Sequence, residues 1–126
     1  MDTDVTPSSP PAEQGHLTVC ESEHHVHISP TGRKFDGIAV RELFETAMRL
    51  ISKRDLRMLI DLTGVDLVTS GAMGMFVTIR KKFLSTGGQL HIAVPDPQVM
   101  EQFELLNLQR VLSLFHSVDE AVERFK

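Results

Sequence analysis

The sequence predicts an α/β domain in which helices pack on a mixed, mainly parallel sheet of four to five strands. Short apolar runs alternate with segments of helical periodicity in the order β-β-α-β-α-β-α-β-α, which is typical of layered α/β domains. The chain has 126 residues, the size of one domain, with 41% hydrophobic and 24% charged residues. This balance excludes collagen-like and disulfide-stapled proteins, and the single Cys20 cannot form an intramolecular disulfide. We therefore expect about four helices packed on one sheet.

Residues 1–14 have the composition of a disordered tail. They are rich in proline, serine and acids, so they cannot bury enough apolar surface to offset the cost of ordering. Residues 1–16 carry a charge of -3 out of the -4 of the whole chain. The sequence therefore predicts a tail over residues 1–14 and a folded, nearly neutral domain over residues 15–126.

Two alternating segments predict the strands that open the domain. Residues 17–20 and 25–28 alternate apolar and polar side chains, and they could pair as a hairpin. Asp36 then fits the N-cap of a helix that runs to about Ile51, because apolar residues recur there at spacings of three and four. This buried stripe comprises Val40, Leu43, Phe44, Ala47, Leu50 and Ile51.

The middle of the chain predicts a strand, a helix and a second strand. Residues 57–61 form a short apolar run suited to a buried strand. A helix is expected to begin with Ser70 as its N-cap and to run to about Ser85, where the following glycines end it. Residues 90–94 form the next apolar strand.

Capping residues mark the last two helices. Asp96 and Pro97 fit the N-cap and first residue of a helix whose inward residues would be Val99, Met100, Phe103 and Leu106. Residues 111–115 predict a last strand. Ser117 fits the N-cap of a closing helix, with Glu120 in the capping-box position.

An ordered series of motifs runs from Met58 to Leu108. An apolar strand ends in Asp, a Thr-Ser-Gly turn leads into a helix, a Gly-Gly break precedes another strand, and the next helix ends with Asn107. These pieces lie at residues 59–65, 68–74, 87–92 and 103–108. The series resembles the STAS domain, the fold of bacterial anti-sigma-factor antagonists, and the resemblance covers nearly all of residues 17–126. In that family, glycine is usual at the position of Asn107.

The resemblance implies an anti-sigma factor antagonist controlled by phosphorylation. In the family, the serine at the start of the second helix is phosphorylated by an anti-sigma factor that is itself a serine kinase. The unphosphorylated antagonist captures this kinase, and phosphorylation releases it. Alignment through Gly74 places the serine at Ser70, with Thr69 as the fallback acceptor. The implied partners are an anti-sigma factor of the serine kinase type and a phosphoserine phosphatase.

The same resemblance assigns a partner-binding surface to the starts of the first two helices. It comprises Asp36, Thr69, Ser70, Gly71, Ala72, Met73, Gly74 and Met75. Structural roles also account for several of these residues, since Asp36 and Ser70 fit N-caps and Met73 fits the core. Both roles stay open at this point.

Departures from the family pattern favour an alternative function. Thr69 replaces the acid that usually precedes the serine, and Gly71 replaces the usual second serine. The segment 32–36 is also one residue longer and more basic than in the family. In lacking this acid, the sequence resembles STAS proteins of signalling scaffolds and membrane transport complexes. The alternative is therefore an interaction module without a phosphorylation switch.

Other function classes lack sequence support. The nearly neutral domain has no basic face for nucleic acid, and the sequence contains no phosphate-binding glycine loop or catalytic triad. His25 and His27 could share one strand face, but no third metal ligand stands at a recognisable spacing. We therefore expect no enzyme activity, cofactor or metal, no membrane insertion, and a cytoplasmic location.

Overall fold

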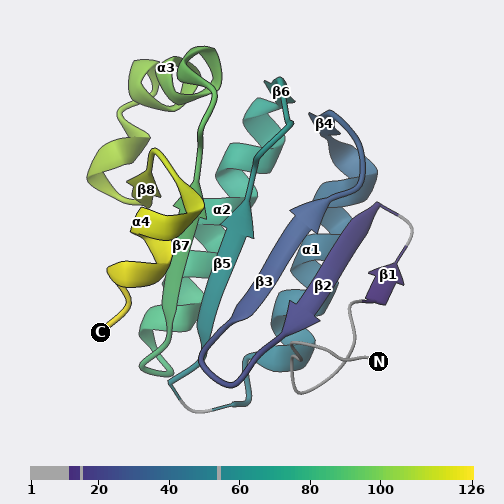
Figure 1. Cartoon of the computed structure of the whole chain (residues 1–126), viewed down its shortest axis with the longest axis vertical. Coiled ribbons are helices and arrows are strands. Elements are labelled where there is room, and N and C mark those ends of the chain that lie inside the picture. The colour runs from purple at the N-terminus through teal and green to yellow at the C-terminus, as the bar shows by residue number, and fades with distance from the viewer. Residues whose placement is uncertain (1–11, 15, 54) are drawn as a thin grey trace.

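The computed structural model describes residues 12–14, 16–53 and 55–126, which form one mixed sheet with helices on both faces (Figure 1). Its six strands have the order β1-β2-β3-β5-β7-β8. Strands β1 to β3 pair antiparallel, while β3, β5, β7 and β8 pair parallel. Their bounds are β1 Ala12–Gln14, β2 Leu17–Glu21, β3 Val26–Pro30, β5 Arg57–Asp61, β7 Gln89–Ala93 and β8 Ser113–Phe115. The predicted α/β fold with a mixed sheet is confirmed.

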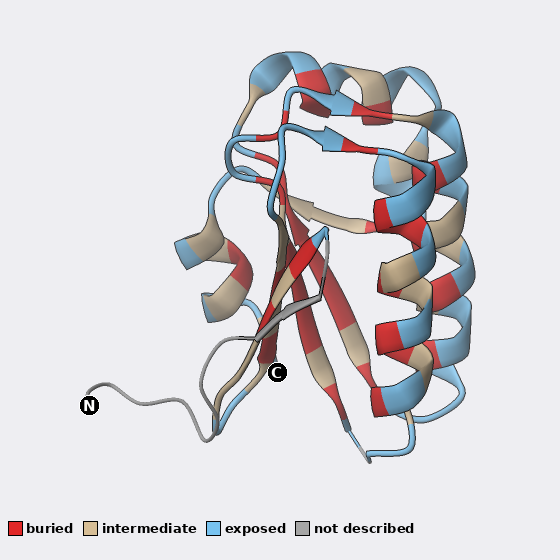
Figure 2. Cartoon of the chain, turned by 90° about the vertical axis from the view of Figure 1, so that its right-hand side faces the viewer, coloured by how far each residue is buried: buried red, intermediate tan, exposed pale blue. Residues whose placement is uncertain are grey.

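The helices divide between the two faces of the sheet. The long helices α1 (Gly37–Leu50) and α2 (Ser70–Leu84) cover one face, and the short α4 (Val118–Glu123) lies on the other, as Figure 2 shows from the side. Helix α3 (Pro97–Leu105) and the 3-10 turn η1 (Leu108–Arg110) connect β7 to β8. Within the described residues, none of these helices is both long and apolar enough to cross a membrane.

The main core lies between the sheet and the two long helices. Phe76 of α2 packs edge-on against Phe35, with ring centroids 5.3 Å apart, and stacks on Phe103 of α3 at 6.1 Å. A smaller cluster of Leu59, Ala93 and Ala121 lies under α4. This arrangement fixes α2 firmly against the sheet and leaves its first residue at the surface.

Several predicted boundaries need correction. Ala12–Gln14, predicted to belong to the tail, form β1 and pair with β2, while residues 1–11 lie outside the described residues. The last strand begins at Ser113 instead of Val111, because Val111 is the C-cap of η1 and the N–H groups of Val111 and Leu112 both donate to the Leu108 carbonyl. Leu106, predicted to face inward, follows the end of α3 and is 54% exposed.

The predicted caps of the last two helices are confirmed. The Asp96 carboxylate accepts a hydrogen bond from the Gln98 N–H at 2.9 Å, and the Ser117 hydroxyl accepts one from the Glu120 N–H at 3.1 Å. Asn107 adopts a left-handed conformation with φ 57°. Because Asn tolerates this region better than most residues, it can stand where the family pattern has glycine.

Candidate functional site

A short strand pair that the sequence did not predict brings the starts of the two long helices together. Strands β4 (Lys34–Phe35) and β6 (Leu67–Val68) pair parallel, with Phe35 opposite Val68. The Thr69 N–H donates to the Phe35 carbonyl at 3.2 Å and so extends the pairing by one residue. Figure 1 shows both strands at the same end of the domain, next to α1 and α2. We call residues 33–38 and 66–75 the paired helix starts.

Thr69, and not Ser70, is the N-cap of α2. Its backbone is extended, and its hydroxyl accepts a hydrogen bond from the Ala72 N–H at 3.2 Å and donates to the Phe35 carbonyl at 3.5 Å. The prediction that Ser70 caps this helix is therefore wrong. The physical reason is the β4–β6 pairing, which holds Thr69 in the extended conformation that an N-cap requires.

Ser70 is the first helical residue and lies exposed at the surface. Its hydroxyl forms no hydrogen bond with any residue that the structure describes. The two candidate phosphorylation sites therefore differ in accessibility. The Thr69 side chain is half-buried and its hydroxyl caps the helix, whereas the Ser70 hydroxyl is available to an approaching molecule.

The residues that follow Ser70 alternate between surface and core. Gly71 and Gly74 are exposed, and a Cβ atom built on Gly74 would meet nothing within 4 Å. Ala72 and Met73 are buried at 0% and 3% exposure, so their side chains pack in the core and do not line the surface. Met75 is half-buried and packs against that core. Two predicted partner-binding residues thus have no accessible side chain, while the glycines leave room for a close approach.

Asp36 lies across the β4–β6 pair from Thr69, since each follows a paired strand residue in register. It occupies the N-cap position of α1, as predicted, but its side chain makes no capping hydrogen bond. Because it is exposed as well, its carboxylate is free to contact a partner.

Sequence reasoning missed three side chains of the paired helix starts. Ile38 and Leu67 are apolar yet 59% and 40% exposed. Arg33 forms an ion pair with Asp66 at 2.7 Å between Nη2 and Oδ2, and its carbonyl accepts the Asp66 N–H at 2.9 Å. The exposure of Ile38 could have been predicted from sequence, because Ile38 lies outside the stripe of apolar residues at spacings of three and four that begins at Val40.

His25, just before β3, and His27 within it make other contacts than those of a metal site in the described part of the chain. The His27 Nε2 atom lies 2.8 Å from the Asp61 carboxylate, and His25 stacks on the Phe125 ring at 5.8 Å. Burial raises the pKa of Asp61, but hydrogen bonds from His27 and Thr63 outweigh it, so the pKa is lowered overall. Among the described residues, no three His, Cys, Asp or Glu side chains converge as metal ligands.

Comparison with known sequences identifies a matching family and two relatives. The STAS domain family profile matches residues 18–121. A Thermotoga maritima protein named as a candidate anti-sigma factor antagonist is 29% identical over 65 residues, which are 52% of this chain and 58% of that protein. Its homologue in Thermotoga neapolitana is 28% identical over 67 residues, or 53% and 59% of the two chains. The matched region thus spans a little over half the length of each relative.

Solved structures share the fold at lower identity. A STAS domain protein of Planctomyces limnophilus superposes with a TM-score of 0.74 at 18% identity, over 87% of this chain and 97% of that chain. The anti-sigma factor antagonist SpoIIAA in its unphosphorylated form gives 0.70 at 16% identity, over 86% and 94%. SpoIIAA of Bacillus in its phosphorylated form gives 0.65 at 14% identity, over 87% and 99%.

Proposed function

The chain belongs to the STAS domain family, and from this premise we propose that it is an anti-sigma factor antagonist that binds an anti-sigma kinase and is released when Ser70 is phosphorylated. The names of its sequence relatives and structural neighbours support the general role. The observation that carries the switch is that the Ser70 side chain, at the first position of α2, is exposed and has no hydrogen-bond partner among the described residues.

The position of Ser70 suits a phosphate group. The first N–H groups of a helix have no partner within the helix and lie at the positive end of its dipole, so they stabilise an anion. No acidic residue occupies the first turn of α2. A phosphate on Ser70 would add about -1.5 to -2 charges without breaking a hydrogen bond of the described chain.

The paired helix starts also offer what a protein interface needs. Ile38 and Leu67 provide exposed apolar area within the paired helix starts, which also contain the exposed small residues Gly71 and Gly74. A partner that buries this area would desolvate Ser70. A phosphate there would have to be desolvated too, and burying an unpaired charge is costly. Phosphorylation would therefore weaken the complex by acting directly at the interface.

The second candidate function is a STAS interaction module without a switch. The observation that favours it is Thr69, which replaces the acid of the family pattern with a neutral side chain already engaged in capping. A kinase that reads that acid would find no carboxylate at this position. The two candidates share the surface and differ only in the modification.

Phosphorylation in vitro separates the two functions. The purified chain is incubated with ATP and the cognate anti-sigma kinase, and its intact mass is then measured. We expect the natural chain to gain one phosphate group and Ser70→Ala to gain none. Ser85→Ala, which removes an exposed serine at the other end of α2, should still gain one. A chain that binds the kinase but gains no phosphate would support the module without a switch. Phosphate retained in Ser70→Ala would place the acceptor elsewhere.

A further inference from the structure

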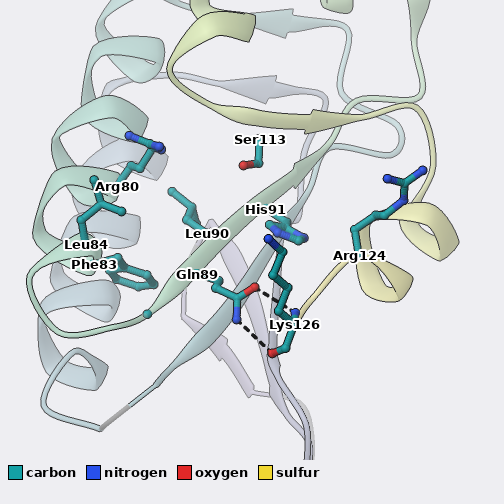
Figure 3. A pocket seen from close by; sticks show the side chains of 10 residues that line it. Arg80, Phe83, Leu84, Gln89, Leu90, His91, Ser113, Arg124 and Lys126 are labelled. Atoms are coloured by element: carbon teal, nitrogen blue, oxygen red, sulfur yellow. Dashed lines mark hydrogen bonds between the residues drawn. The ribbon is translucent and has the colours of Figure 1, made fainter.

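A hollow far along α2 from Ser70 lies at the edge of the sheet. Strand β8 pairs only with His91, Ile92 and Ala93, so the first half of β7 has no strand on that side. The C-terminal half of α2, the start of β7, the start of β8 and the residues after α4 surround the resulting space of about 270 Å³. Figure 3 shows the α2 side chains on one side of this hollow and those of the chain's last residues on the other.

The charged side chains that line the hollow are all basic. Arg80 comes from α2, and Arg124 and Lys126 come from the residues after α4; no carboxylate side chain is among the lining residues. Within the described residues, none of these three cations forms an ion pair. Unpaired cations gathered around one space favour an anionic occupant, and arginine in particular binds carboxylate and phosphate oxygens through two parallel hydrogen bonds.

Polar groups of the sheet add defined hydrogen-bonding capacity. The Ser113 hydroxyl lines the hollow and forms no hydrogen bond among the described residues. His91 is buried, and its Nδ1 atom must donate to the Ala121 carbonyl at 2.8 Å, because a carbonyl can only accept. Gln89 is fixed by two hydrogen bonds to the Lys126 backbone, at 3.0 and 3.2 Å. The wall next to the cations is therefore held in place.

The remaining wall is apolar. Phe83 and Leu84 of α2 and Leu90 of β7 line it, and Leu84 is 59% exposed. The hollow is slightly smaller than the roughly 300–1,000 Å³ of sites for drug-sized ligands. A ligand that satisfies both walls is thus small and carries an oxyanion joined to an apolar group.

We propose that this hollow is a binding site for a small organic oxyanion, a phosphate monoester or a carboxylate. Arg80 and Ser113 hold the oxyanion, Arg124 and Lys126 add positive charge from the opposite side, and Leu84 and Leu90 contact the apolar group. The site is distinct from the paired helix starts, and its existence does not depend on phosphorylation of Ser70. Because it bridges α2 and the chain after α4, an occupant stabilises the packing of these two segments.

Titration of the full chain, followed by amide NMR shifts, tests the site. The probes are phenyl phosphate, benzoate, inorganic phosphate and phenol, at low and moderate salt. We expect phenyl phosphate and benzoate to shift the amides of Gln89, Leu90 and Ser113, and the stronger of the two identifies the oxyanion class. Inorganic phosphate should bind about tenfold more weakly, and phenol should not bind at the hollow. Binding should weaken as salt rises, because exposed charges are screened.

Variants decide which side chains hold the anion. Arg80→Gln should weaken the better probe about tenfold, and Arg124→Gln and Ser113→Ala should each weaken it about threefold. Lys82→Gln is the matched control, since it removes a neighbouring exposed cation of α2 that does not line the hollow. Equal affinity in Arg80→Gln and Lys82→Gln overturns the proposal, as do shifts confined to the paired helix starts or phenol binding as tightly as phenyl phosphate. Ser113→Ala and Arg124→Gln test it independently if Arg80→Gln unfolds.

Discussion

The identity of the α2 cap makes a sharp prediction about two adjacent hydroxyls. Thr69→Ala removes the oxygen that accepts the Ala72 N–H at 3.2 Å and that donates to the Phe35 carbonyl at 3.5 Å. Ala72 is fully buried, so water cannot easily replace the lost partner. Replacement of an N-cap Thr by Ala costs about 0.5–2 kcal/mol, typically ~1 kcal/mol. For a domain of this size, that loss corresponds to a decrease of about 3–5 °C in melting temperature.

The neighbouring substitution should have little effect on stability. Ser70→Ala removes a hydroxyl that is exposed and without a described partner, and alanine has the higher helix propensity. We expect its free energy of unfolding to stay within about 0.5 kcal/mol of the natural chain. Thr69→Ser is the matched control, because it keeps the capping oxygen and should retain most of the stability.

Chemical denaturation and thermal melts of the three variants measure these differences. The expected order of stability places the natural chain, Ser70→Ala and Thr69→Ser together, with Thr69→Ala clearly below them. If Ser70→Ala lost as much stability as Thr69→Ala, Ser70 would share the capping role. Its hydroxyl would then not be free for a kinase, and the reasoning behind the proposed switch would fail.

Four further predictions follow from burial, charge and titration. Ser70→Asp should keep its melting temperature, since an acid suits a helix start, but should lose the anti-sigma partner in a pull-down; undiminished binding would refute the charge-based switch. Ile38→Ser should weaken the same complex with little change in stability, whereas equal affinity would remove Ile38 from the interface. Leu59→Ala should cost about 2–5 kcal/mol in denaturant unfolding, because Leu59 is fully buried under α4; a neutral result would mean that this cluster contributes little. Burial lowers the pKa of both His25 and His91, and neighbouring histidines lower that of His25 further. The unfolded chain therefore binds more protons just below pH 6.5, so stability should fall as pH drops through this range; a flat unfolding free energy between about pH 7.5 and 5.5 would contradict it.

The elements that could be predicted from sequence are those with a period or a capping residue. The stripe from Val40 to Leu50 recurs at helical spacing and is buried against the sheet. The side chains of Asp96 and Ser117 each accept a hydrogen bond from an N–H group of the helix that follows. In each case the residues that decide the local structure are neighbours in sequence, so a short window contains the information.

The paired helix starts could not be predicted in the same way. Strands of two residues, such as Lys34–Phe35, are too short to show alternation. Their pairing joins segments more than thirty positions apart, and that pairing selects Thr69 over Ser70 as the cap. Both residue types are good caps, so local sequence alone cannot choose between them. β1 escaped prediction for another reason, because its three residues lie at the end of a segment with the composition of a tail.

Capping of α2 and the proposed phosphorylation fall on two different residues, Thr69 and Ser70. Since Thr69 secures the helix start, a phosphate on Ser70 breaks no hydrogen bond that holds α2 in place. The phosphorylated and unmodified chains should then share one fold, and the change in affinity must arise from the charge that a partner meets. Thr69 is neutral where the family pattern has an acid, while Asp36 lies across the strand pair from it and Asp66 pairs with Arg33. A phosphate adds about -1.5 to -2 charges to this surface whatever acids already lie there, so the loss of affinity depends on how much of that charge the partner must desolvate.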